Sequence, residues 1–486
     1  MKININPREE LFKWGPIDMK LVYGSGFIFG VLREIKKYYQ WSWPPVFFFI
    51  DYQGKGLWVN GYSALREVGL KYFKKYFLNQ KNYNNQWEKF EDWLQEYSVV
   101  SADLEKNFRR NISKKGLSKD LEKFADFVLR FWLIVHVPEI ANWGGEYLLK
   151  TELEKIDPAR ADEYLEILSA PVKYSFFQEE ELALLQLAKI KSRAELAEGL
   201  KDHAKNWHWI LNSYGGNRVL NPEYFSGKLK ELLKRDRAEN IIKEIKSKIS
   251  SNQKRKDDLI KKLKLDKKIV FIAEQLSQSI WWQDFRKGYI WRMNHLWDLA
   301  LRAVERQTSW KFKEMQYCYF DEMAKVLNGK IDKKKVLRRQ KHYAFYFDEG
   351  KMYEFSDKRT FDKFWHLYAE EKMVRSSEIK GLLVSRGQGG IVRGRARIIT
   401  NPFEEQNKFK QGEILVAGMT SPEYIVVMKK ASAIITNYGG MTCHAAIVSR
   451  ELGVPCLVNT RNATKIIQTG DLVEVDADRS LVRIIN

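Results

Sequence analysis

The chain has 486 residues, of which 44% are hydrophobic and 30% charged, and this composition is typical of folded proteins. A chain of this length is expected to form two or three domains. Its longest apolar cluster, residues 46–50, is far too short to cross a bilayer. The three cysteines, Cys318, Cys443 and Cys456, have no spacing typical of a disulfide framework or a zinc site. We therefore expect a cytoplasmic protein with no membrane partner and no metal site of its own.

The first 371 residues predict a mostly α-helical region, because their apolar residues recur every three or four positions. Two segments break this pattern, and each predicts two strands joined by a glycine-containing turn: residues 46–61 and 343–357. The predicted helices cover residues 64–78, 85–97, 121–134, 162–168, 179–188, 194–207, 227–268 and 277–327. The expected fold class is multidomain α+β, with a helical N-terminal region that carries short β-hairpins.

The strongest local charge lies in residues 227–268, which hold 16 basic and 7 acidic side chains. Leucine and isoleucine recur there at helical spacing, and the polar run at 250–258 predicts a turn, so we expect a helical hairpin with a solvated basic face. Together with the net charge of +21, this hairpin leaves nucleic-acid binding as an alternative, which predicts affinity that falls steeply with salt. No base-reading motif lies nearby, so we do not expect a nucleic-acid partner.

The clearest domain boundary is compositional. Of the 66 Phe, Trp and Tyr residues only four follow Gly381, and none of the 16 Trp does. A glycine-rich run then precedes an alternating segment at 391–399 that predicts a strand. We therefore expect a helical region at residues 1–371, a swivel linker at 372–380 and a second domain at 381–486.

In this second domain, strand and helix signals alternate and lead to one histidine. We expect a strand at residues 413–417, a short helix at 421–431 and a second strand at 432–436. A glycine turn follows, and Thr442 stands at the N-cap position of a helix over 443–452. Gly453 and Pro455 end that helix, as a glycine just past the last turn and a following proline commonly do. His444 is thereby placed in the first helical turn.

The first turn of a helix suits a phosphoryl group, since backbone N–H groups and the positive end of the helix dipole lie there. That positive end also disfavours an imidazolium, so we expect His444 to be neutral, nucleophilic and exposed near pH 7. Gly439 and Gly440 let the backbone bend beside the ring and leave room for a phosphoryl donor. Thr442 as the cap and Cys443 as a small helix residue complete the expected support of the site.

The run GGMTCHAAIVSRELGVPC resembles the phosphohistidine signature of the phosphoenolpyruvate-utilising (dikinase) family, which includes phosphoenolpyruvate synthase and rifampicin phosphotransferase. The resemblance spans residues 380–485 and includes the segments GGIVRGRARII, GEILVAGMTSPE and GDLVEVDA. It implies a compact β/β/α swivelling domain and phosphorylation of His444. One departure is that Ala477, Asp478 and Ser480 replace the glycines usual after VD, in a turn far from the histidine in sequence.

No segment resembles the ATP-grasp domain or the pyruvate-binding barrel of the complete dikinases. The resemblance therefore implies an incomplete phosphotransferase, whose ATP and Mg²⁺ are held by a separate ATP-grasp subunit. The swivelling domain itself is expected to bind no cofactor. The helical region would then bind a small-molecule acceptor or serve as a docking scaffold.

Two functions stay open at this point. In the first, His444 is phosphorylated and passes the phosphoryl group to an acceptor, with either ATP or phosphoenolpyruvate as the original donor. In the second, the chain is a non-catalytic regulatory or docking protein that retains a phosphohistidine domain. Neither the acceptor nor the partner subunit can be named from these residues.

Overall fold

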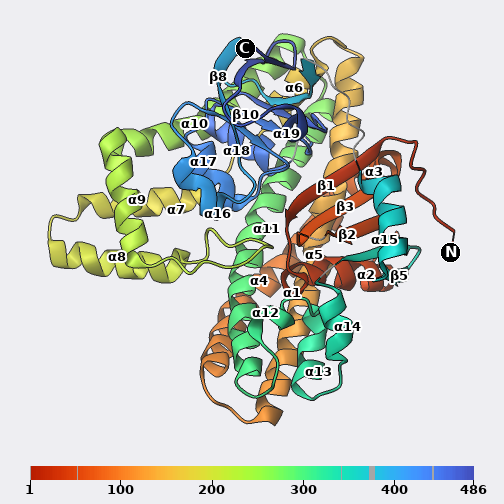
Figure 1. Cartoon of the computed structure of the whole chain (residues 1–486). Coiled ribbons are helices and arrows are strands. Elements are labelled where there is room, and N and C mark those ends of the chain that lie inside the picture. Colours follow the sequence, from red (N-terminus) through yellow and green to blue (C-terminus); the bar gives the residue numbers. More distant parts are fainter. Residues whose placement is uncertain (1, 52, 341, 371–377, 441–442, 486) are drawn as a thin grey trace.

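The computed structural model describes residues 2–51, 53–340, 342–370, 378–440 and 443–485. These residues form α-helices and two β-sheets, which confirms the expected α+β fold class. In Figure 1 one sheet combines red N-terminal strands with teal strands from residues 343–355, and the other lies in the blue C-terminal part of the chain. No helix within the described ranges is long and apolar enough to cross a bilayer.

Each predicted helix has a counterpart in the structure, although several are longer than expected. The helices up to residue 370 are α1 (Leu21–Ser25), α2 (Leu32–Tyr38), α3 (Tyr62–Tyr76), α4 (Gln80–Arg109), α5 (Lys114–Glu154), α6 (Ala161–Ser169), α7 (Phe176–Gln186), α8 (Arg193–Trp207), α9 (Pro222–Arg235), α10 (Ala238–Leu263), α11 (Lys267–Glu305), α12 (Phe312–Met315), α13 (Met323–Leu327), α14 (Lys333–Arg338) and α15 (Lys358–Phe364). The long helices α5 and α11 pack against each other and form the frame of this region.

The first sheet is antiparallel, with the strand order β1-β3-β2-β4-β5. Its strands are β1 (Leu11–Asp18), β2 (Val46–Ile50), β3 (Lys55–Gly61), β4 (Tyr343–Asp348) and β5 (Lys351–Phe355). Both predicted hairpins are present, and β2 pairs with β4 so that the two hairpins, distant in sequence, form one sheet. Strand β2 is buried along its whole length, because Phe48 faces the main core while Phe47 and Phe49 face a second cluster.

Helices α3 and α5 approach each other closely through glycine. A Cβ on Gly144 would lie 2.0 Å from the backbone nitrogen of Leu70, and one on Gly69 would lie 2.6 Å from the carbonyl oxygen of Ile140. Helix α5 also continues through Pro138, where the ring removes one helical hydrogen bond and packing on both sides maintains the helix. This long helix therefore depends on contacts that its own sequence does not supply.

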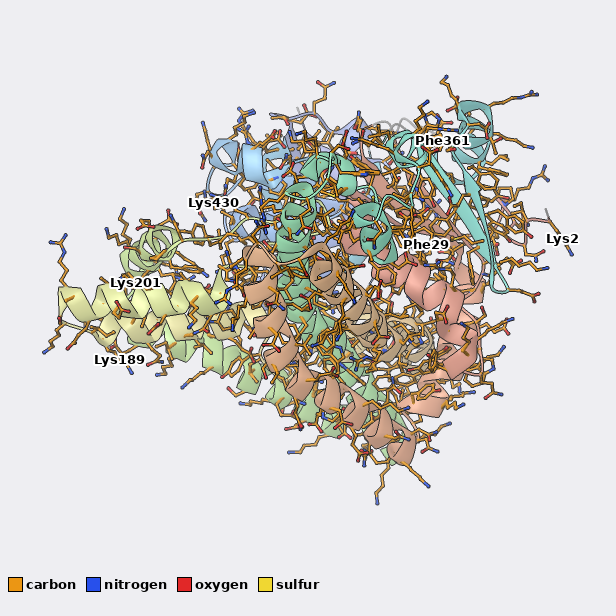
Figure 2. The ribbon with its side chains drawn as sticks, turned by 90° about the horizontal axis from the view of Figure 1, so that it is seen from below. Lys2, Phe29, Lys189, Lys201, Phe361 and Lys430 are labelled. Carbon is orange, nitrogen blue, oxygen red and sulfur yellow. The ribbon has the colours of Figure 1, made fainter. Side chains whose placement is uncertain are left out.

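The helices α7, α8, α9 and α10 form an arm that projects from the body of the molecule (Figures 1 and 2), with Lys189 and Lys201 toward its outer end in Figure 2. The break between the two basic helices lies at Asp236 and Arg237, so the predicted turn at 250–258 is wrong. That polar run is a mostly exposed stretch of α10, and its polarity reflects solvation instead of a chain reversal.

The second sheet has eight strands in the order β6-β13-β12-β8-β9-β10-β11-β7. Its strands are β6 (Glu378–Lys380), β7 (Leu382–Ser385), β8 (Ile391–Ile398), β9 (Ile414–Ala417), β10 (Ala433–Thr436), β11 (Cys456–Val458), β12 (Leu472–Asp476) and β13 (Leu481–Ile484). Its helices are α16 (Pro402–Glu405), α17 (Ile425–Met428), α18 (His444–Leu452) and α19 (Ala463–Ile466). The strands from β8 to β11 run parallel, and β9 and β10 are fully buried between helices on both faces.

Residues 371–377, which include the first six residues of the segment predicted as a linker, lie outside the described residues. Residues 378–380 form β6, which pairs with β13 at the edge of the second sheet. The proposed swivel boundary therefore stays a prediction.

Gly144→Ala should destabilise the protein by about 1–3 kcal/mol or more, because the added methyl group meets backbone atoms of α3 that cannot rotate away. Gly227→Ala is the matched control, since a Cβ at this position of α9 meets nothing within 4 Å. It should be neutral or should stabilise by about 0.5–1 kcal/mol. Urea unfolding of both variants tests this expectation, and equal midpoints would contradict it.

Candidate functional site

Helix α18 places His444 at its first position. The N-cap is Cys443, so the predicted N-cap at Thr442 is wrong by one residue, and Thr442 itself lies outside the described residues. The helix ends as predicted, with Gly453 left-handed at φ +66°. Backbone N–H groups of the first turn and the positive end of the helix dipole therefore lie directly beside the ring of His444.

Thr420, which follows β9, fixes the orientation of the His444 ring. Its Oγ1 lies 2.9 Å from Nδ1, while Nε2 is buried and has no hydrogen-bond partner among the described residues. A neutral imidazole carries one proton, and only Nδ1 has an acceptor for it. We assign the proton to Nδ1, donated to Thr420, so that the lone pair of Nε2 is available. We expected the ring of His444 to be exposed, and for Nε2 this expectation is wrong because the atom is buried.

Burial lowers the pKa of His444 well below its ordinary value, and the positive charge of Lys287 on α11 lowers it further. Burial also lowers the pKa of Lys287, which the Asp284 carboxylate, 3.8 Å from its Nζ, partly offsets. The imidazole is therefore neutral at pH 7, with a cation from the N-terminal region nearby.

The predicted neighbours of His444 have different surroundings. Gly439 adopts φ +137°, and a Cβ there would lie 2.8 Å from the sulfur of Cys443, so glycine is required. Gly440 has no positive φ, and a Cβ there would make ordinary contact with Trp143 of α5. Burial raises the pKa of the Cys443 thiol, which therefore stays protonated.

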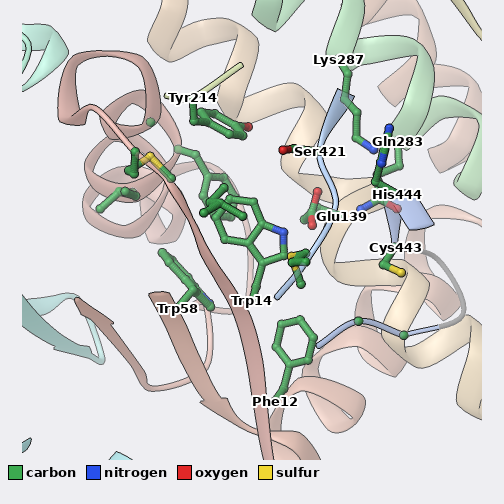
Figure 3. Close-up of a pocket in the computed structure, with 18 of the residues that line it drawn as sticks. Phe12, Trp14, Trp58, Glu139, Tyr214, Gln283, Lys287, Ser421, Cys443 and His444 are labelled. Atoms are coloured by element: carbon green, nitrogen blue, oxygen red, sulfur yellow. The ribbon is translucent and has the colours of Figure 1, made fainter. Parts of the chain in front are cut away.

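His444 opens onto a cavity of about 150 Å³ at the junction of both parts of the chain (Figure 3). The second domain contributes Met419, Thr420, Ser421, Gly439, Gly440, Cys443 and His444. The N-terminal region contributes the aromatic side chains Phe12, Trp14, Phe27, Trp43, Phe48, Trp58, Trp132, Trp143, Tyr214 and Trp291. Its polar contributions are Asn60, Glu139, Gln283, Arg286 and Lys287. In Figure 3, Glu139, Gln283 and Lys287 gather around the ring of His444, and Trp14 and Trp58 lie farther into the cavity.

Sequence reasoning missed the residues that meet His444 from elsewhere. Thr420 lies in the segment GEILVAGMTSPE, so the family resemblance contained a signal for it. Glu139 and Lys287 lie within long helices that carry no motif, and only the fold brings them to the histidine. Across the described ranges, no three His, Cys, Asp or Glu side chains are grouped in a way that could hold a metal ion.

Residues 409–480 match the family model described as the PEP-utilising enzyme, mobile domain. This part of the chain is a PEP-utilising mobile domain. Over an alignment of 115 residues, the chain is 50% identical to a probable phosphoenolpyruvate synthase of Methanothermobacter thermautotrophicus. This alignment covers 23% of this chain and 16% of that protein. Over 143 residues it is 44% identical to the phosphoenolpyruvate synthase of Pyrococcus furiosus, covering 29% of this chain and 17% of that protein. The chain thus spans about a sixth of the length of these relatives, and the family resemblance is confirmed.

The mobile domain, as we call the second sheet with its helices, packs on the N-terminal region. Lys429 beside α17 forms an ion pair with Glu181 of the arm, and the Lys55 ammonium donates a hydrogen bond of 3.4 Å to the Thr400 carbonyl oxygen. Apolar side chains of α17 and α18 belong to the same buried cluster as the core around α5 and α11. This apolar contact joins the helix that carries His444 to the N-terminal region.

Lys287→Met should raise the pKa of His444 toward its ordinary value, because a nearby cation disfavours the imidazolium. The rise should be partial, since burial is the larger cause. Titration of the His444 ring by NMR measures it. Lys254→Met on the exposed face of α10 is the control and should leave the titration unchanged. An unchanged pKa in Lys287→Met would contradict the assigned role of this lysine.

Proposed function

We propose that this chain is the phosphotransferase component of a dikinase-like enzyme and that His444 transiently carries the phosphoryl group. The supporting observation is a neutral imidazole, oriented by Thr420, that lines the cavity and whose buried Nε2 has no hydrogen-bond partner among the described residues. Loading breaks a P–O bond of the donor and forms an Nε2–P bond. The first-turn N–H groups of α18 and the ammonium of Lys287 then offset the charge of the phosphoryl oxygens.

The donor side lies on a separate ATP-grasp subunit that holds ATP and Mg²⁺. A partner of that size cannot reach Nε2 while the ring faces the N-terminal region, so the mobile domain leaves its docked position for loading. It then returns with the phosphoryl group to the cavity, where a small-molecule acceptor is held. A purely docking role would not require an unpartnered lone pair in a cavity, which favours transfer over the regulatory alternative.

His444→Ala should abolish phosphorylation in extract of the native host supplied with ATP that carries radioactive phosphorus at the β position. Wild-type protein should gain an acid-labile, base-stable label, because a phosphoramidate hydrolyses in acid. His366→Ala is the control: this histidine is exposed, pairs with Glu370, and should not affect labelling. If only phosphoenolpyruvate labelled the protein, phosphoenolpyruvate and not ATP would be the donor. Label retained in His444→Ala would refute the assignment of the carrier.

Lys429→Glu should weaken docking of the mobile domain, because it replaces the ion pair with Glu181 by a like-charge contact. We expect a larger radius of gyration in solution scattering and faster loading by the donor subunit. Discharge to the acceptor should become slower. The double variant Lys429→Glu, Glu181→Lys restores opposite charges and should recover wild-type behaviour. Unchanged shape and unchanged rates in the single variant would contradict a swivelling carrier.

A further inference from the structure

The cavity beside His444 is apolar over most of its wall. Rings of Phe27, Trp43 and Trp58 pack on one another with centroids 5.2–6.0 Å apart. On another side, Trp14 contacts Tyr214, which in turn contacts Trp291. A cavity of about 150 Å³ with such walls accommodates a single six-membered ring and binds apolar compounds in preference to water.

Several donors in this apolar wall lack an acceptor. The indole nitrogens of Trp43 and Trp291 are buried without a hydrogen-bond partner in the described part of the chain. The same holds for Nε and Nη1 of Arg286, whose side chain is 4% exposed and whose Nη2 pairs with Glu139. By contrast, the Trp58 indole donates to Asn60 at 2.5 Å. Buried donors left unpaired are costly, so a ligand that brings an oxygen acceptor within reach of any of them gains a hydrogen bond.

We infer that the cavity is the acceptor site and that the acceptor is a small apolar hydroxyl compound of about one ring with a second oxygen. The inference deepens the proposed function and rests on it. The hydroxyl group lies between His444 and the Glu139–Arg286 pair. The apolar body lies among the aromatic rings, where the indole N–H of Trp43 or Trp291 meets the second oxygen.

The transfer step balances with the groups that line the cavity. The acceptor oxygen attacks phosphorus, an O–P bond forms, and the Nε2–P bond breaks with its electron pair returning to Nε2. The hydroxyl proton passes to the Glu139 carboxylate, and the ring keeps its Nδ1 proton on Thr420. Lys287 and Arg286 stabilise the charge on the phosphoryl oxygens during transfer.

Binding is tested first, with His444→Ala as well as wild-type protein, so that no phosphorylation is needed. The probes are cyclohexanol, 4-ethylphenol and 4-methoxyphenol, followed by tryptophan fluorescence and calorimetry, with glycerol and pyruvate as polar comparisons. Both proteins should bind the ring compounds at least about tenfold more tightly than glycerol or pyruvate. Equal or stronger binding of the polar compounds would overturn the inference.

Two variants locate the bound probe. Ile28→Phe fills the cavity and should abolish binding of all three ring compounds. Trp43→Phe should weaken 4-methoxyphenol several-fold relative to 4-ethylphenol, since only the ether oxygen accepts a hydrogen bond. Trp282→Phe is the matched control, because its indole N–H is also buried and unpaired but lies outside the cavity. An effect of Trp282→Phe equal to that of Trp43→Phe would place the probe elsewhere.

Transfer is tested on protein loaded chemically at His444 with phosphoramidate and followed by phosphorus NMR. Ring alcohols should discharge His444 and appear as phosphate monoesters, and Glu139→Gln should slow this step about 100-fold with little change in binding. Loading of His444 followed by discharge only to pyruvate or glycerol would overturn the inference and leave the proposed function intact. Failure of His444 to load, with ring compounds still bound, would overturn the proposed function instead.

Discussion

In the proposed function, one nitrogen atom, Nε2 of His444, has to meet two opposite requirements. During transfer it must be shielded from water, because a phosphohistidine in contact with water is lost to hydrolysis. During loading it must be open to a donor on another surface. In the docked arrangement Nε2 is buried at the junction with the N-terminal region, which fits the transfer side of the proposed cycle. Side chains from the first sheet, α5 and α11 line the cavity beside that atom.

The junction itself is held by apolar contact and contains carboxyl groups that are poorly solvated. Burial raises the pKa of Glu146 on α5 and of Glu423 in the mobile domain to about 7, and that of Glu451 on α18 to about 8. Charges on the opposite side of the junction also shift two of these pKa values. Arg450 lowers the pKa of Glu146, and Asp284 raises the pKa of Glu451. A raised carboxyl pKa means that docking favours the protonated form, so its contribution is present at low pH and is lost as pH rises through 7 to 8.

Local sequence signals predicted the elements that depend on local chemistry. The turn glycine, the C-terminal glycine of α18 and the strands at 414–417 and 433–436 were found, because neighbouring residues determine them. Local signals did not predict the pairing of β2 with β4 or the continuation of α5 through Pro138, since both depend on partners distant in sequence. The N-cap was misplaced by one residue because a threonine is the stronger capping residue, whereas Cys443 caps without a side-chain hydrogen bond.

The same division explains why the histidine could be found and its surroundings could not. His444 lies in a segment that matches a family model, so its sequence alone marked it as a candidate. Glu139, Arg286 and Lys287 lie in long helices without a motif, and only the packing of those helices brings them to the site. Every Phe, Trp and Tyr side chain that lines the cavity comes from the N-terminal region, whereas the mobile domain supplies the imidazole of His444. Among the described residues, Met419 is the one large apolar side chain that the mobile domain adds to the lining, so this domain offers an acceptor little apolar surface. In the proposed function, selection of the acceptor therefore rests mainly on the N-terminal region, whose aromatic residues form most of the cavity wall.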